Sequence, residues 1–128
     1  MAATARVLVV DDNDGIRELV RDVLSWAGHE TATAPDGLAA LEVIERWSPD
    51  VIVLDAMMPR MDGPQFARTY LDRPGPHAPI IAFTAASDGP CRAAEMRASS
   101  FVGKPFSPDE LLRQIDIFAC SSSDQSAA

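Results

Sequence analysis

The sequence lacks several features that would assign it to particular classes of protein. No apolar run approaches the roughly 18 residues of a membrane-spanning helix, and residues 1–6 lack the basic and apolar regions of a signal peptide. Its two cysteines, Cys91 and Cys120, form no short-spaced pair, and no His-Glu-x-x-His motif is present. Neither a disulfide framework nor a zinc site is therefore indicated. We expect a cytoplasmic protein with no membrane association.

Basic residues are also scarce. Eleven Lys and Arg face nineteen Asp and Glu, which leaves a formal net charge of −8. This balance argues against direct nucleic-acid binding, because such binding depends on basic side chains that meet phosphates. Lys104 is the only lysine, and every other basic residue is arginine. A compact ammonium group on a flexible stem differs chemically from a guanidinium group, so Lys104 is a candidate site residue.

The 128 residues are enough for one domain with a buried core. Short apolar runs alternate with longer amphipathic stretches, which predicts an α/β domain of three layers with a parallel sheet. The expected strands cover residues 6–10, 31–34, 51–54, 79–83 and 101–103, of which the second and fifth are weak enough for edge strands. The expected helices cover about residues 16–27, 38–47, 63–71, 93–98 and 107–118.

The domain is expected to span residues 1–120. Residues 121–128 are small and polar, which predicts a disordered tail or the start of a linker. The chain contains no internal repeat and has no room for a second domain.

Polar residues follow four of the expected strands. In an open parallel sheet, ligands bind beyond the carboxyl ends of the strands, so these residues should share one rim. They comprise three carboxylates, one hydroxyl and one ammonium group: Asp11, Asp12, Asp55, Thr84 and Lys104. The carboxylates would repel one another unless a cation neutralised them, and a few hard oxygen ligands suit Mg²⁺.

A metal ion beside a carboxylate offsets the charge of an incoming phosphoryl group, so that the carboxylate can attack phosphorus. Lys104 and Thr84 would then bind the phosphoryl oxygens. The rim thus has the parts needed for aspartyl-phosphate chemistry. Taken alone, Asp11 and Asp12 would more simply cap the following helix, and Asp55 would be a turn residue. The combination with Lys104 favours the metal and phosphoryl site.

Four motifs at the strand ends support a specific resemblance. They are Val-Val-Asp-Asp at 9–12, Leu-Asp-Ala-Met-Met-Pro-Arg-Met-Asp-Gly at 54–63, Phe-Thr-Ala at 83–85 and Lys-Pro-Phe at 104–106. The sequence resembles the receiver domain of two-component response regulators over residues 5–120. This resemblance implies a flavodoxin-like, doubly wound sheet of five strands in the order 2-1-3-4-5, with five helices.

The resemblance also implies roles for individual residues. Asp55 would be the phosphoacceptor. Asp11, Asp12, Asp55 and the backbone carbonyl of Met57 would hold Mg²⁺, for which Mn²⁺ can substitute. Thr84 and Lys104 would contact the phosphoryl group, and Phe101 would be the switch aromatic, although it could equally be a core residue. Arg97 stands where the family often has glycine, which requires an unusual helix exit or backbone angle.

The function implied is a phosphorylation switch in a phosphorelay, not a metabolic enzyme. A sensor histidine kinase or a histidine phosphotransfer protein would phosphorylate Asp55. The face formed by the fourth helix, fifth strand and fifth helix would then bind a downstream protein. Dimerisation on phosphorylation stays open.

Three alternatives remain beside this interpretation. A Mg²⁺-dependent phosphohydrolase would use Asp55 as nucleophile, but it would usually have a second acid at the position of Met57. A flavodoxin-like nucleotide or flavin carrier would need a Gly/Ser/Thr-rich loop after the first strand, where this chain has Asp-Asp-Asn-Asp. The chain could also be the receiver fragment of a longer DNA-binding or enzymatic regulator.

Overall fold

The structure is a computed structural model that describes residues 4–127, without the side chains of residue 86 and residues 120–127. Five parallel strands form one sheet in the order β2-β1-β3-β4-β5, as predicted. The strands are β1 (Arg6–Val10), β2 (Glu30–Ala34), β3 (Val51–Leu54), β4 (Ile80–Ala85) and β5 (Ser100–Lys104). The helices are α1 (Asp14–Trp26), α2 (Gly37–Arg46), α3 (Gly63–Asp72), α4 (Gly89–Glu95) and α5 (Pro108–Ala127), with a 3₁₀ turn, η1 (Ala86–Asp88), before α4.

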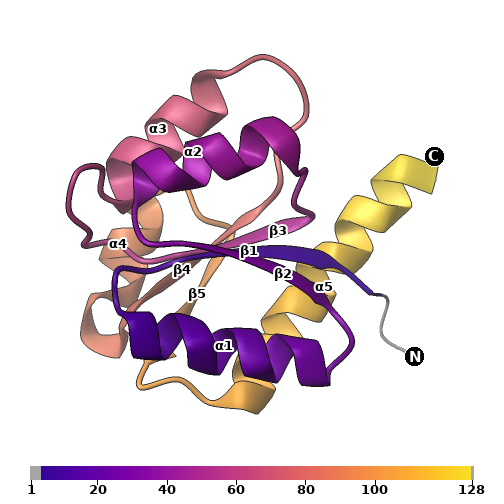
Figure 1. The fold of residues 1–128 in the computed structure, drawn as a ribbon, viewed down its shortest axis with the longest axis horizontal. Coiled ribbons are helices and arrows are strands. Elements are labelled where there is room, and N and C mark those ends of the chain that lie inside the picture. The colour runs from indigo at the N-terminus through magenta and orange to yellow at the C-terminus, as the bar shows by residue number, and fades with distance from the viewer. Residues whose placement is uncertain (1–3, 128) are drawn as a thin grey trace.

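The helices cover both faces of the sheet. Figure 1 shows α2 and α3 on one face and α1 on the other. Leu8 and Ile52 pack in a core cluster with residues of α2 and α3, whereas Val7 and Val53 pack in a second cluster with residues of α1 and α5. Successive residues of a strand point to opposite faces, so a strand covered on both sides is apolar at every position. This explains the continuous apolar runs of β1 and β3.

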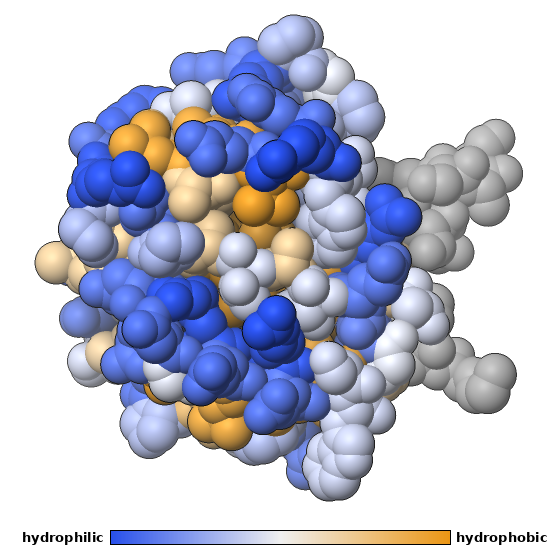
Figure 2. Space-filling view, viewed as in Figure 1, coloured by the Kyte–Doolittle hydropathy of each residue, from blue (hydrophilic) through white to orange (hydrophobic). Residues whose placement is uncertain are grey.

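The surface over α1 and α2 is mainly hydrophilic, with apolar residues exposed in small separate patches (Figure 2). Trp26 and Leu19 of α1 are among the exposed large apolar residues. Isolated residues of this kind are normal on a protein surface. Among the helices of residues 4–127, none combines the length and apolar character needed to cross a membrane.

Two ends of helices differ from the simplest expectation. The helix predicted over residues 93–98 begins earlier, at Gly89, because proline is well tolerated in a first helical turn and Pro90 therefore starts α4 instead of preceding it. Arg97, just after α4, has a φ of 50°, which is the uncommon backbone angle anticipated for a non-glycine residue at this position.

The last helix is long. The backbone of α5 stays helical to Ala127, beyond the expected domain boundary at residue 120. The interpretation of residues 121–128 as a tail or linker stays a prediction, and residue 128 lies outside the described residues.

Candidate functional site

The carboxyl ends of the strands bring the predicted residues together. Asp11 follows β1 and Asp55 follows β3, while Thr84 and Lys104 lie at the ends of β4 and β5. One carboxylate oxygen from each of Asp11, Asp12 and Asp55 lies within 4.8 Å of the others. The sheet order places β1 and β3 side by side at its centre, which explains why residues so distant in sequence meet.

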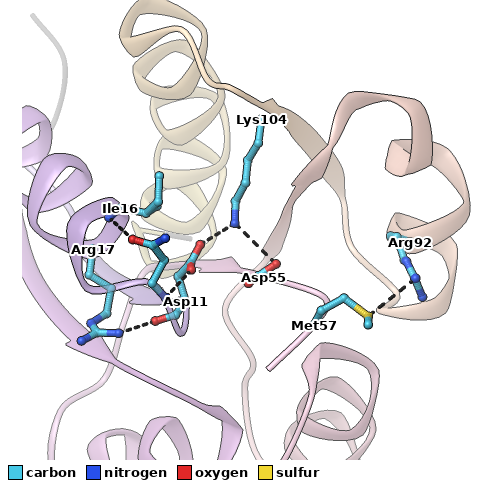
Figure 3. A network of polar contacts seen from close by, with 8 residues as sticks. Asp11, Ile16, Arg17, Asp55, Met57, Arg92 and Lys104 are labelled. Carbon is cyan, nitrogen blue, oxygen red and sulfur yellow. Dashed lines mark hydrogen bonds and ion pairs between the residues drawn. The ribbon is translucent and has the colours of Figure 1, made fainter. Parts of the chain in front are cut away.

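Lys104 points into this acidic group. Figure 3 shows its side chain reaching from β5 toward Asp11 and Asp55. Its Nζ lies 2.6 Å from Asp11 Oδ2 and 3.6 Å from Asp55 Oδ1. The single lysine of the chain thus contacts the two buried carboxylates, and it stays partly accessible to an incoming group.

Asp11 is fixed by the start of α1. It is fully buried, and its Oδ1 accepts a hydrogen bond of 2.9 Å from the backbone N–H of Asn13. Arg17 donates to the backbone carbonyl of Asp11 at 2.7 Å. Asn13, rather than either aspartate, caps α1 by accepting the N–H of Ile16 at 3.0 Å. The simple capping explanation for the two aspartates is therefore wrong, and Asp11 instead accepts hydrogen bonds from the Asn13 N–H and from Lys104.

Asp55 titrates abnormally in this environment. Its pKa is raised from 3.8 to about 6, mainly because burial disfavours the charged carboxylate and also because the negative charge of Asp11 lies nearby. The charge of Lys104 and the backbone N–H of Met57 act in the opposite direction. Asp55 is only 7 % exposed, whereas Asp12 beside it is exposed. The cluster therefore has an excess of negative charge that a cation would relieve.

The donor set fits Mg²⁺. The cluster offers three carboxylates, two buried and one exposed, and so few protein oxygens suit Mg²⁺, which keeps several of its waters, better than Ca²⁺, which takes six to eight oxygen ligands. Asp11, Asp12 and Asp55 are the residues that could hold the ion. The backbone carbonyl of Met57 stays a predicted ligand.

The two predicted switch residues lie in the neighbouring strands β4 and β5. Thr84 is buried, with 6 % exposure, and pairs with Gly103 in the register of β4 and β5. Phe101 is partly buried and packs against the core cluster beneath α2, α3 and α4. A Cβ at Gly89 would overlap the Phe101 ring, so the ring lies directly against the start of α4.

Some contacts of the site were not anticipated from the sequence. Arg17 and Asn13 support Asp11, as described above. Met57, with 64 % exposure, receives a contact of 3.7 Å from Arg92 of α4 to its sulfur atom (Figure 3). No periodicity or motif marks these residues, because their roles depend on which loops meet in space.

A family model now decides the identity. The model of the response regulator receiver domain matches residues 7–116. The chain belongs to this family. Receiver domains are signalling modules of two-component systems, and the predicted family resemblance is confirmed.

Individual receiver-domain proteins agree with this assignment. The response regulator MprA of Mycobacterium leprae is 41 % identical over 112 residues, which cover 86 % of this chain and 49 % of that protein. The chain therefore spans about half the length of the curated relatives it matches.

Solved receiver structures show the same fold. The chemotaxis response regulator CheY4 of Vibrio cholerae superposes with a TM-score of 0.81 at 33 % identity, covering 91 % of this chain and 99 % of that one. NtrX from Brucella abortus has a TM-score of 0.87 at 30 % identity, covering 98 % of this chain but 29 % of that one. The same receiver fold thus occurs both in a chain of similar length and within a much longer one.

Proposed function

We propose that the chain is the phosphoacceptor receiver of a two-component phosphorelay, with Asp55 as the phosphorylated residue. The single observation that carries this proposal is the meeting of Asp11, Asp12 and Asp55 with Lys104 at the carboxyl ends of the central strands. A structural ion pair would need only one carboxylate. Three carboxylates around one ammonium group suit a site that receives a cation and an anion together.

In the proposed reaction, a carboxylate oxygen of Asp55 attacks the phosphorus atom of a phosphohistidine donor. A phosphorus–oxygen bond forms while the phosphorus–nitrogen bond breaks, and the donor ring, protonated beforehand on its other nitrogen, takes the bonding electron pair and leaves as neutral imidazole. Lys104 needs only a small movement to place its ammonium group on a phosphoryl oxygen, since it already lies 3.6 Å from Asp55. Thr84 would donate its hydroxyl to a second oxygen. Bound Mg²⁺ would offset the charge of the phosphoryl group.

The switch is proposed to act through Thr84, Phe101 and α4. If Thr84 moves toward the phosphoryl group, the space beside β4 and β5 changes, and the Phe101 ring can reposition against Gly89. The face of α4, β5 and α5 would then present a different surface to a downstream protein. A tenfold shift between the two conformations needs about 1.4 kcal/mol of differential interaction, which one or two charge-assisted hydrogen bonds can supply.

The partners in this proposal are a sensor histidine kinase or histidine phosphotransfer protein and a downstream protein target. Autophosphorylation from small donors and slow self-hydrolysis would be the only catalytic activities. The net charge of −8 favours a protein target over nucleic acid. A cytoplasmic location belongs to the same proposal, and dimerisation on phosphorylation stays a prediction.

The test is labelling by phosphoramidate with and without Mg²⁺. We expect the wild-type protein to gain one phosphoryl group only when Mg²⁺ is present, and Asp55→Asn to gain none. Asp72→Asn, on the exposed end of α3, is the matched control and should label normally. Equal labelling of Asp55→Asn and wild type would refute Asp55 as the acceptor. Continuous release of phosphate from simple phosphate esters would instead favour the phosphohydrolase.

A further inference from the structure

The loop between β3 and α3 carries Asp55 and Met57, and its two ends are joined. The backbone N–H of Gly63, the first residue of α3, donates to the carbonyl of Ala56 at 2.9 Å. The loop therefore closes on itself immediately after the phosphoacceptor. Its geometry depends on whatever holds the residues between these two ends.

A second segment holds the C-terminal half of this loop. The N–H of Gly37, at the start of α2, donates to the carbonyl of Met61 at 2.9 Å. A Cβ at Gly37 would lie 2.6 Å from Met61 Cγ, so the two backbones approach as closely as a glycine allows. The turn before α2 is thus packed against the loop that carries Asp55.

Arg60 and Asp36 form the strongest contact between these two segments. Arg60 Nε lies 2.8 Å from Asp36 Oδ2, and Arg60 Nη2 lies 3.1 Å from Asp36 Oδ1, which makes a bidentate pair. Asp36 is only 4 % exposed, and its Oδ1 also caps α2 by accepting the N–H of Ala39 at 2.9 Å. Burial opposes ionisation of this carboxyl, but the Ala39 N–H and Arg60 outweigh it, so the pKa of Asp36 is lowered.

Arg60 makes this pair from a strained backbone. Its φ is 63°, in the left-handed region that costs a non-glycine residue about 1–2 kcal/mol. Arg97 is the other non-glycine residue with a positive φ in residues 4–127, and no ion pair of its side chain occurs within that part of the chain. Strain that is retained together with a bidentate bond to a buried carboxylate is typical of a residue that sets the geometry of a functional loop.

We propose that Asp36 and Arg60 are positioning residues that hold the β3–α3 loop, and with it Asp55 and the Met57 backbone, in the geometry that binds the cation. Neither residue belongs to the cluster of Asp11, Asp12 and Asp55 that could hold the cation. The pair acts by tying the C-terminal half of the loop to the N-terminus of α2, which Asp36 caps. The expected effect on metal binding rests on the proposed function. The restraint on the loop is independent of it.

The decisive variant is Asp36→Ser. Serine also caps helices, so α2 keeps its N-cap, but one neutral hydroxyl cannot accept the bidentate pair. Arg60→Gly is the reciprocal variant, which removes the side chain and relieves the backbone strain. Arg97→Gly is the matched control, because it makes the same replacement at the other left-handed arginine.

Two measurements separate positioning from general stability. Hydrogen exchange of the Gly63 amide in metal-free protein reports the closure of the loop, and calorimetric titration with Mg²⁺ reports the site. We expect Asp36→Ser and Arg60→Gly each to speed exchange of this amide at least fivefold and to raise the Mg²⁺ dissociation constant at least threefold. The double variant should be no worse than either single variant, because the two residues act as one unit. Arg97→Gly should change neither quantity.

Several results would overturn the inference. The inference is wrong if both single variants show the same Gly63 exchange rate and the same Mg²⁺ affinity as the wild type. Faster exchange across the amides of all five strands, in step with a lower urea midpoint, would show that the pair only supports the fold. If wild-type protein bound no Mg²⁺ and gained no phosphoryl group, the proposed function would fail, while the exchange of metal-free Gly63 would still test the restraint. If the wild type is labelled normally but loop exchange is unaltered in the variants, the positioning role of Asp36 and Arg60 is wrong and the proposed function stands.

Discussion

The β3–α3 loop with α3 and the β4–α4 segment differ sharply in how they are held, although both follow central strands. Asp62 and Gln65 form a reciprocal capping box at the start of α3. The N-cap residue of α4, Asp88, makes no side-chain capping bond, and this helix has only seven residues.

The buried surface of the two helices differs in the same direction. Within α3, Phe66, Ala67 and Tyr70 are buried in addition to Gly63, whereas Gly89 is the buried residue of α4 itself. A short helix that buries few residues and lacks a side-chain N-cap needs little free energy to shift. The segment that bears the proposed phosphoacceptor is therefore held by more contacts than the segment proposed to carry the signal.

The substitution expected to have the largest effect on stability is Gly63→Ala. A Cβ at this position would lie 2.5 Å from the backbone oxygen of Asp55 and 2.9 Å from Ala56 Cα, and backbone atoms cannot turn aside. We expect the free energy of unfolding to fall by about 3 kcal/mol, as measured by urea denaturation.

Gly89→Ala is the counterpart on the α4 side. The three atoms nearest the added Cβ all belong to the ring of Phe101, a partly exposed side chain that can give way more easily than backbone atoms. A loss of about 1 kcal/mol is expected, together with greater solvent exposure of the Phe101 ring by NMR. Equal losses in the two variants would contradict the difference in rigidity between the segments.

The pH dependence of stability should reveal the electrostatic strain on the loop. In metal-free protein, the pKa of Asp55 is about 6 when folded, against 3.8 for an ordinary aspartate. Between these values the folded chain holds a proton that the unfolded chain releases, so Asp55 favours folding at pH 4 and this contribution is lost as the pH rises through 6.

The variant Asp55→Asn removes this dependence. Relative to wild type, it should gain about 1–2 kcal/mol of stability between pH 4 and pH 7 in EDTA. Chemical denaturation at a series of pH values measures the difference. Saturating Mg²⁺ should reduce it, because the ion stabilises the wild-type carboxylate. A difference that stayed constant with pH would show that Asp55 is not strained.

Removing the helix caps gives a smaller effect. Asp62→Ala should cost about 1 kcal/mol, because the side chain accepts the N–H of Gln65 at 2.9 Å. Asp88→Ala should change the urea midpoint very little, since no capping bond is lost. A larger loss of stability for Asp88→Ala than for Asp62→Ala would contradict the conclusion that α3 is the better capped helix.

The smallest expected effect is a gain. Arg97→Gly relieves a φ of 50° without removing an ion pair, so stability should rise by about 0.5–1 kcal/mol. Arg60→Gly should give less than this gain, because relief of strain is offset by loss of the bond to Asp36. Thermal unfolding of the two variants side by side measures the contrast. A greater gain for Arg60→Gly would mean that its ion pair contributes little.

Much of the fold could be predicted from local patterns. The apolar run of residues 7–10 lies in β1, because the part of a strand that is buried on both faces has no polar position. The start of α4 lies before the predicted residue 93, since its first turn, Gly89–Pro90, has no apolar periodicity to mark it. The rim residues Asp55 and Lys104 were found because they end apolar strands, and strand ends converge in a parallel sheet.

The supporting contacts were beyond the reach of such patterns. Asp36 and Arg60 are 24 residues apart and belong to no shared period, so only the meeting of two loops brings their side chains together. Asn13 is a good capping residue, but the competing aspartates before it concealed its role. The raised pKa of Asp55 likewise depends on its depth in the folded chain and on the nearness of Asp11.

The order of apolar and polar residues along the chain was sufficient to determine the alternation of strands and helices and the residues that reach the rim, because hydrophobic burial acts through local periodicity. Tertiary structure alone decided how strongly each rim group is desolvated, which loop is tied to which helix and where the backbone is strained. These properties depend on distances between segments remote in sequence, and such distances exist only once the sheet has assembled.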